Sequence, residues 1–270
     1  MIRVELLKML RRPRTWVTIA LLNALPTLVA VLLAVTDVAP QPGEGPPFLS
    51  AVLGDGTLYP LAALAIVLPL FMPVAVALYA GEAVAGEAQA GTLRYLLVRP
   101  VGRTRLLVAK LISTLSFVLL ATVVVAVVGY GVGVLLLGDG TGSTVTGISG
   151  TSLTSAQLVQ RTVLSVGYVA LSMLGVAALA LLLSTVSDSP LAAALGALAF
   201  LIASTLLLTL DAAQALRPYL PTRYWLAFVD LFRDPIVWRD LERGVLLQGV
   251  YVLVFLGIGW ANFSTKDVTS

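Results

Sequence analysis

The chain contains neither cysteine nor histidine. Without cysteine no disulfide can form, and without histidine the commonest metal ligand and general base is missing. We therefore expect no catalytic, metal-binding or cofactor-binding residues in this chain. Charged residues are scarce as well, at 11% of 270 residues, while 59% are apolar. Soluble domains average roughly 25% charged and 45–50% apolar residues, so this composition predicts a membrane protein.

Long stretches of the sequence lack lysine, arginine, aspartate and glutamate altogether. A bilayer core requires about 20 apolar residues per helix, and six windows meet this requirement. They cover residues 16–36, 58–80, 111–137, 162–186, 190–210 and 244–263. The first is longer than the apolar core of a signal peptide and precedes no convincing cleavage site. We predict an all-α membrane protein with six transmembrane helices in a single domain, 1–270.

Two connecting segments, 37–57 and 138–160, contain no lysine or arginine. Basic residues instead cluster before the first window, after the second and after the sixth. By the positive-inside rule the two segments are external and both termini are cytoplasmic. The glycine-rich stretch 138–150 is then interpreted as a flexible outer loop.

The segment 211–243 would also be external, although it contains five arginines together with five acidic residues. The eleven basic residues on the other side outweigh these five, so we keep six spans. Trp225, Phe228 and Phe232 repeat here at helical spacing. Aromatic rings favour the membrane interface, which predicts short interfacial helices. An ordinary ordered loop is the alternative.

The N-terminus is amphipathic. Ile2, Leu6, Met9 and Leu10 share one helical face, and the opposite face is charged. Pro13 ends such a helix because proline lacks an amide donor and disfavours a helical residue before it. We predict an elbow helix on the cytoplasmic membrane surface. Attraction of its basic side chains to anionic lipid explains it sufficiently, and a docking role is the alternative. The basic residues assigned to this elbow are Lys8, Arg11 and Arg12.

Charge is concentrated in the stretch GEAVAGEAQAGTLRYLLVRPVGRTR, residues 81–105. Gly91 can end the preceding helix, Thr92 can cap a new one and Pro100 ends it, which predicts a short helix over 92–99. Its leucines repeat at i, i+3 and i+4. A helix of two turns is not stable alone, so these leucines must contact either the lipid headgroups or another protein.

The run GEAQAGTLRYLLVRPVGRTRLLVAK, residues 86–110, resembles the segment after the second span in ABC-2 type permeases, the membrane subunits of a class of ABC transporters. Ala109 departs from the glycine often found there. The resemblance implies that 92–99 is a cytoplasmic coupling helix seated in a cleft of an ATPase subunit, with charge-assisted contacts from Glu87, Arg94 and Arg99 and leucine anchors. The implied coupling residues are Glu87, Gly91, Thr92, Leu93, Arg94, Leu96, Leu97, Arg99 and Pro100.

No phosphate-binding loop surrounds any of the three lysines, Lys8, Lys110 and Lys266, so ATP and Mg are expected on a partner ATPase. The resemblance implies two ATPase subunits and a second permease chain, most simply a homodimer. Gly129 and Gly133 permit close helix approach and are a candidate dimer seam.

The expected function is export of an amphipathic or hydrophobic substrate across a bacterial plasma membrane, without a nucleic-acid partner. A secondary transporter is the first alternative, although the predicted spans lack charged ion-coupling groups. A membrane enzyme or scaffold is the other, although no clustered nucleophile or metal ligands support an enzyme.

Overall fold

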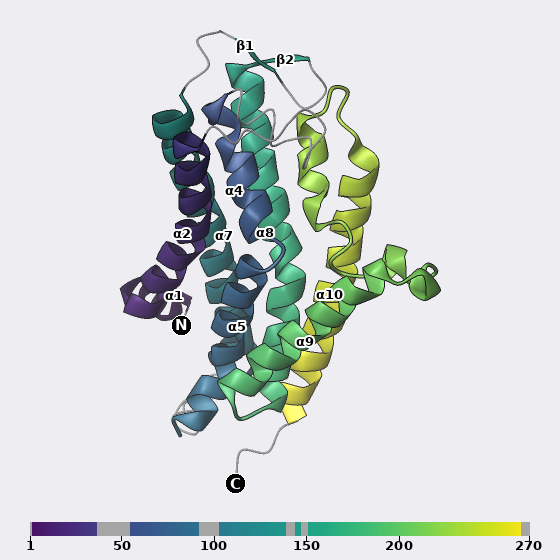
Figure 1. The fold of residues 1–270 in the computed structure, drawn as a ribbon. Helices are drawn as coiled ribbons and strands as arrows, with labels where there is room; N and C mark the ends of the chain where they lie inside the picture. The colour runs from purple at the N-terminus through teal and green to yellow at the C-terminus, as the bar shows by residue number, and fades with distance from the viewer. Residues whose placement is uncertain (1, 37–54, 92–102, 139–143, 147–150, 266–270) are drawn as a thin grey trace.

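The computed structural model describes residues 2–36, 55–91, 103–138, 144–146 and 151–265, and the predicted helix 92–99 lies outside these ranges. The described part is almost entirely helical (Figure 1). Its α-helices are α1 (Ile2–Arg11), α2 (Pro13–Val35), α4 (Tyr59–Val67), α5 (Phe71–Gln89), α7 (Arg103–Leu137), α8 (Ser155–Val186), α9 (Pro190–Thr209) and α10 (Trp238–Thr265). The shorter elements are the 3-10 helices η1 (Gly56–Leu58), η2 (Asp211–Ala213), η3 (Arg217–Tyr219) and η4 (Trp225–Phe232) and the strands β1 (Thr144–Thr146) and β2 (Ser152–Thr154).

Five of the described helices, α2, α7, α8, α9 and α10, are long and apolar enough to cross a bilayer. These helices are compatible with a multi-pass membrane protein. The region of the predicted span 58–80 forms α4 and α5, which are bent by 59° relative to each other. Pro69 and Pro73 account for the break, since each lacks an amide donor and its ring excludes the preceding helical turn. Counting the bent pair as one span gives six.

Helix α8 lies at the centre of the bundle, with α5 and α7 packed on one side and α10 on the other (Figure 1). The second half of α8 is buried on nearly all sides, whereas its first half has one exposed face. The β1–β2 hairpin stands at the end of the bundle where α8 begins, called the hairpin end below. The opposite end, where α5 ends and α7 begins, is called the α1 end.

Part of the stretch 138–150, which was predicted to be a flexible outer loop, forms strand β1 of the hairpin. Thr144 pairs with Thr154 and Thr146 with Ser152 in an antiparallel register. The Thr154 hydroxyl accepts a hydrogen bond from the Gln157 amide, and the Gln157 side chain accepts one from the Thr154 amide. This reciprocal capping box explains why α8 begins at Ser155, before the predicted 162.

Gly129 and Gly133 are used inside the chain, which corrects their assignment to a dimer seam. A Cβ atom at Gly133 would lie 2.2 Å from the Gly56 carbonyl oxygen, and one at Gly129 would lie 3.0 Å from the Ala63 Cβ atom. Both glycines therefore allow α7 to approach η1 and α4 closely.

The segment between α9 and α10 does form short helices, as predicted, but the three aromatic side chains that repeat at helical spacing face the protein. Trp225, Phe228 and Phe232 are all buried in the core. The Tyr168 hydroxyl of α8 donates to the Tyr224 carbonyl at 2.7 Å, and the Gln248 amide of α10 donates to the Pro221 carbonyl at 2.8 Å. Burial against α8 and α10 stabilises these rings more than an interfacial position would.

Candidate functional site: a charge cluster at the α1 end

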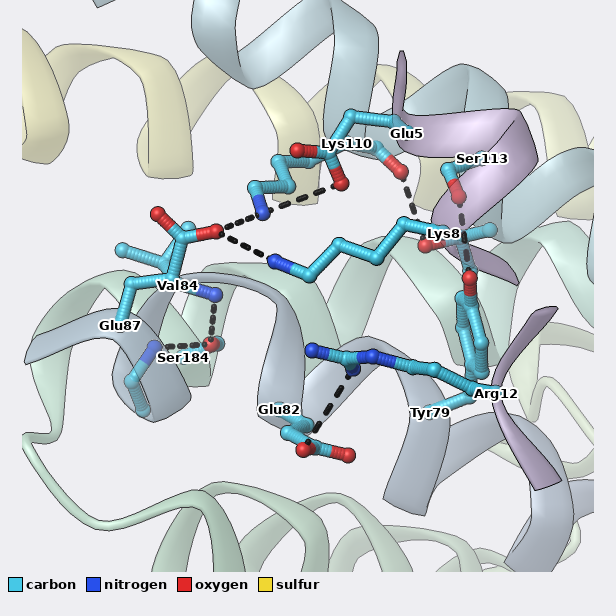
Figure 2. Close-up of polar contacts among 12 residues, drawn as sticks. Glu5, Lys8, Arg12, Tyr79, Glu82, Val84, Glu87, Lys110, Ser113 and Ser184 are labelled. Carbon is cyan, nitrogen blue, oxygen red and sulfur yellow. Dashed lines mark hydrogen bonds and ion pairs between the residues drawn. The ribbon is translucent and has the colours of Figure 1, made fainter. Parts of the chain in front are cut away.

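Six charged side chains, from α1, α5, α7 and the junction of α1 and α2, meet at the α1 end of the bundle (Figure 2). Helix α1 contributes an acid and a base, Arg12 at the junction of α1 and α2 adds a second base, α5 contributes two acids, and α7 contributes one base near its beginning. We call this group the charge cluster. Its members are Glu5, Lys8, Arg12, Glu82, Glu87 and Lys110.

The inner part of the cluster is buried. Lys110 is 5% exposed and Glu87 is 9% exposed, and their side chains form a direct ion pair between α7 and α5. The Lys110 ammonium also donates to a carboxylate oxygen of Glu5 at 3.1 Å, and the Lys8 ammonium donates to Glu87 at 3.3 Å. Each buried charge therefore contacts a charge of opposite sign, which offsets the desolvation that burial imposes.

The outer part of the cluster is more exposed. Glu82 lies 3.6 Å from the Arg12 guanidinium and 3.3 Å from that of Arg14. These two arginines flank Pro13, where α1 ends and α2 begins. Arg12 has an extended backbone, as expected for a residue before proline. Glu82 thus contacts both sides of the break between the two helices.

Uncharged contacts hold α5 in place beside the cluster. The Tyr79 and Ser113 hydroxyls are hydrogen-bonded at 2.9 Å, and the Tyr79 ring stacks on Phe117 of α7 at a centroid distance of 4.4 Å. The buried Ser184 hydroxyl of α8 donates to the Gly81 carbonyl and accepts from the Val84 amide at 3.0 Å. These bonds fix the position of the last turns of α5, which carry both acids of the cluster.

A cavity of about 260 Å³ lies between α1, α5 and α7. Its lining includes all six members of the charge cluster together with Tyr79 and Ser113. Three acids face three bases, so the lining is formally neutral. Every member has an opposite charge within 4 Å, so the ion pairs around the cavity join its helices. A neutral lining of this kind does not concentrate ions of one sign.

Two members of the charge cluster flank residues 92–102 in the sequence. Glu87 lies on the last turns of α5, just before this segment, and Lys110 lies on the second turn of α7, just after it. Both residues also contact α1 through Lys8 and Glu5. The two helices that flank the segment are therefore tied to each other and to α1.

Among the predicted coupling residues, the structure describes Glu87 and Gly91. Gly91 has φ +67°, a left-handed conformation that glycine adopts readily, and ends α5 as predicted. Glu87 contacts Lys8 and Lys110 within the chain. The other predicted residues lie outside the described ranges, namely Thr92, Leu93, Arg94, Leu96, Leu97, Arg99 and Pro100.

Helix α1 ends before Pro13 as predicted, but its charged face is oriented differently from our expectation. Lys8 and Arg12 point toward α5 and α7, whereas Arg11 is exposed on another face of α1. The reason is electrostatic. Without Lys8 and Arg12 beside them, Glu82 and Glu87 of α5 would have fewer opposite charges nearby. Exposed apolar side chains, including Val4 and Leu7, occupy the outward face.

Sequence reasoning did not identify Glu5, Glu82 or Lys110 as members of a shared site. One signal was present, because Glu5 and Lys8 lie at i and i+3 and so share a face of α1. The partners of that face could not be found from periodicity, because they lie 79 and 105 residues away along the chain.

Taken together, the fold and the site define a helical protein, compatible with several membrane crossings, that buries an ion-pair cluster at one end of its bundle. The chain belongs to the family described as "Protein of unknown function (DUF2705)", whose model matches residues 27–269. This match includes Glu82, Glu87 and Lys110 and begins after α1. No curated protein matches the chain.

Proposed function

We propose that the chain is the membrane subunit of an ATP-driven ABC transporter and exports an amphipathic or hydrophobic substrate. In this proposal the chain works as a homodimer with two separate ATPase subunits in a bacterial plasma membrane. Both termini are cytoplasmic, so the α1 end of the bundle faces the ATPases.

The observation that carries the proposal is the position of the charge cluster around residues 92–102. A coupling helix at 92–99 must pass a displacement to the membrane helices on both of its sides. Glu87 and Lys110 join those two helices directly, and α1 is joined to both through Lys8 and Glu5. A push on 92–99 by an ATPase subunit would therefore move α5, α7 and α1 as a unit.

In this proposal the residues that the ABC-2 resemblance implies fall into groups with separate roles. Leu93, Leu96 and Leu97 contact the ATPase, and Arg94 and Arg99 make charged contacts at its surface. Glu87 contributes from inside the membrane subunit, as the link between the coupling helix and α7. The elbow residues Lys8 and Arg12 connect the same link to α1.

The first test is affinity purification of the tagged chain from cells that also express its genomic neighbours, followed by mass analysis and an ATPase assay. The native chain is expected to retain an ATPase subunit, and a Leu93→Asp, Leu97→Asp variant is expected to lose it. If no ATPase accompanies the native chain, the proposal fails.

A second pair of variants tests the role of the cluster. Lys8→Met removes one link between α1 and α5 but leaves the buried Glu87–Lys110 pair in place. It should retain the ATPase subunit while uncoupling ATP hydrolysis from substrate. Arg11→Met is the matched control on the exposed face of α1. Equal coupling in both variants would contradict the transmission role of the cluster.

The second candidate is an ATP-independent carrier, and one observation favours it. Secondary transporters use buried ionisable residues for ion coupling, and Glu87 and Lys110 form a buried ionisable pair. Proton-dependent flux by the purified chain without an ATPase, abolished by Glu87→Gln, would support this candidate over the first.

A further inference from the structure

Two apolar grooves run along the exposed face of α8. The first, of about 500 Å³, lies between α7 and α8, and the second, of about 580 Å³, lies between α8, η4 and α10. Val163 and Gly167 line both grooves. The grooves are thus two parts of one concave surface whose floor is α8, and both have the size of typical small-molecule sites.

Gly167 differs from Gly175 and Gly244, the two glycines where α8 and α10 meet. A Cβ atom added at Gly175 would lie 2.2 Å from the Gln248 side-chain oxygen, and one at Gly244 would lie 2.0 Å from the Tyr168 hydroxyl. Those two glycines allow α8 and α10 to pack closely. A Cβ atom at Gly167 would meet no atom within 4 Å. Its missing side chain leaves open space in the floor shared by both grooves.

A glycine inside a helix costs about 1 kcal/mol relative to alanine. At Gly175 and Gly244 this cost is offset by close packing, but no protein atom takes the space beside Gly167. We propose that the α8 grooves bind one acyl chain of a membrane phospholipid, which passes over Gly167. This proposal goes beyond the transport function and does not depend on it.

The length and polarity of the grooves fit this ligand. From Leu158 to Leu171 the floor rises along α8 by about 20 Å, while one leaflet of a bilayer core is about 15 Å thick. The polar lining groups include Thr57 of η1 and Thr162 on the early turns of α8 in the first groove, and Glu242 on the second turn of α10 in the second. Farther down α8 the lining side chains are apolar except for Tyr168, whose hydroxyl is bonded to the Tyr224 carbonyl. A headgroup therefore fits at the hairpin end, with the chain pointing toward the bundle centre.

The same surface is poorly suited to a helix from a second copy of the chain. Close helix pairs in membranes use small residues spaced four apart. Here Gly167 has Val163 on one side and Leu171 on the other at that spacing. Val163 is 64% exposed and projects beside the open position, which would hold a second helix away from Gly167 but leaves room for a single flexible chain.

The test uses vesicles of phosphatidylethanolamine containing a minor fraction of the same lipid with a diazirine at mid-chain. After irradiation, the labelled peptides of the purified full chain are mapped by mass spectrometry. Labelling is expected to concentrate on 158–171 of α8 and on the facing residues of α7 and α10. Gly167→Leu should lower it about tenfold, equivalent to about 1.4 kcal/mol, because the new side chain occupies the path of the acyl chain.

Gly257→Leu is the matched control, because a Cβ atom at Gly257 on α10 also meets no atom within 4 Å, and this residue lines neither groove. Its labelling should equal that of the native chain. If Gly167→Leu does not fold, Val163→Phe on the same floor should give the same loss. Equal labelling of groove and control variants, or labelling spread evenly over α2 and α9, would overturn the proposal.

The absence of cysteine provides one more arm. A single Val163→Cys variant can form a disulfide only with a second copy of the chain. Lipid occupancy predicts monomeric chains after mild oxidation. Rapid and complete disulfide dimer formation would instead assign the grooves to contact between two copies.

Discussion

The charge cluster and the α8–α10 seam join helices by different physical means. We define the seam by Tyr168, Gly175, Gly244 and Gln248. Neutral hydrogen bonds and the absence of a side chain on the two glycines bring α8, α10 and the 219–235 segment together there. The cluster uses ion pairs at the end of the bundle. Packing contacts are short-ranged and insensitive to solution conditions, whereas ionic contacts respond to neighbouring charges. The seam therefore suits a fixed connection, and the cluster suits one that a partner can shift.

The largest expected effect is in the inner part of the cluster. Lys110→Met removes the buried ammonium that pairs directly with the buried Glu87 carboxylate, and should destabilise the chain by about 3–5 kcal/mol. Unfolding by sodium dodecyl sulfate in mixed micelles measures this change.

Replacing both members of that pair provides the control. In a Glu87→Leu, Lys110→Met double variant no carboxylate of Glu87 remains to be desolvated, so most of the lost stability should return. A double variant that is less stable than Lys110→Met alone would show that the pair itself, rather than compensation of a buried charge, stabilises this end of the bundle.

A smaller effect is expected at the seam. Gly244→Ala places a methyl group against the Tyr168 hydroxyl and should cost about 1–3 kcal/mol of unfolding free energy. Adding Tyr168→Phe removes the clashing oxygen, so the double variant should lose less than the sum of the two single changes. Gly249→Ala, at an open position on the same helix, should be neutral or slightly stabilising. Additive losses would contradict the steric account.

Much of the helical architecture could be predicted from the sequence, because charge-free apolar runs determine which segments can be membrane helices. Their ends were less predictable. The windows stopped at the first charge, yet α8 continues through the buried Arg161, whose guanidinium donates to the Arg233 carbonyl at 3.1 Å. Similarly, α7 begins at Arg103 and buries Lys110, because ion pairs make that burial tolerable.

The site itself was only partly predictable. Gly91 was found because helix-ending signals are local in sequence, whereas Glu87 was named only through the resemblance to ABC-2 type permeases. The contact of α1 with α5 and α7 depends on which helices are neighbours, and hydrophobic periodicity contains no such information. The same limit explains Gly129 and Gly133, whose spacing indicates close approach without identifying the partner as η1 and α4.

The smallest effect is expected for Arg14, which contacts the outer part of the cluster. Its dependence on salt distinguishes this exposed contact from the inner part and from the seam. Arg14 is 82% exposed at its side chain and contacts Glu82 at 3.3 Å, so Arg14→Gln should cost only a few tenths of a kcal/mol at low salt, about the value of an exposed pair. At 1 M salt the Debye length falls to about 3 Å, and this difference should vanish. The losses caused by Lys110→Met and Gly244→Ala should persist in the same titration, because a buried pair and a steric contact are screened little or not at all. If salt removed the Lys110→Met effect as well, the inner part of the cluster would be open to solvent, and the distinction between a buried link and an exposed contact at the α1 end would not hold.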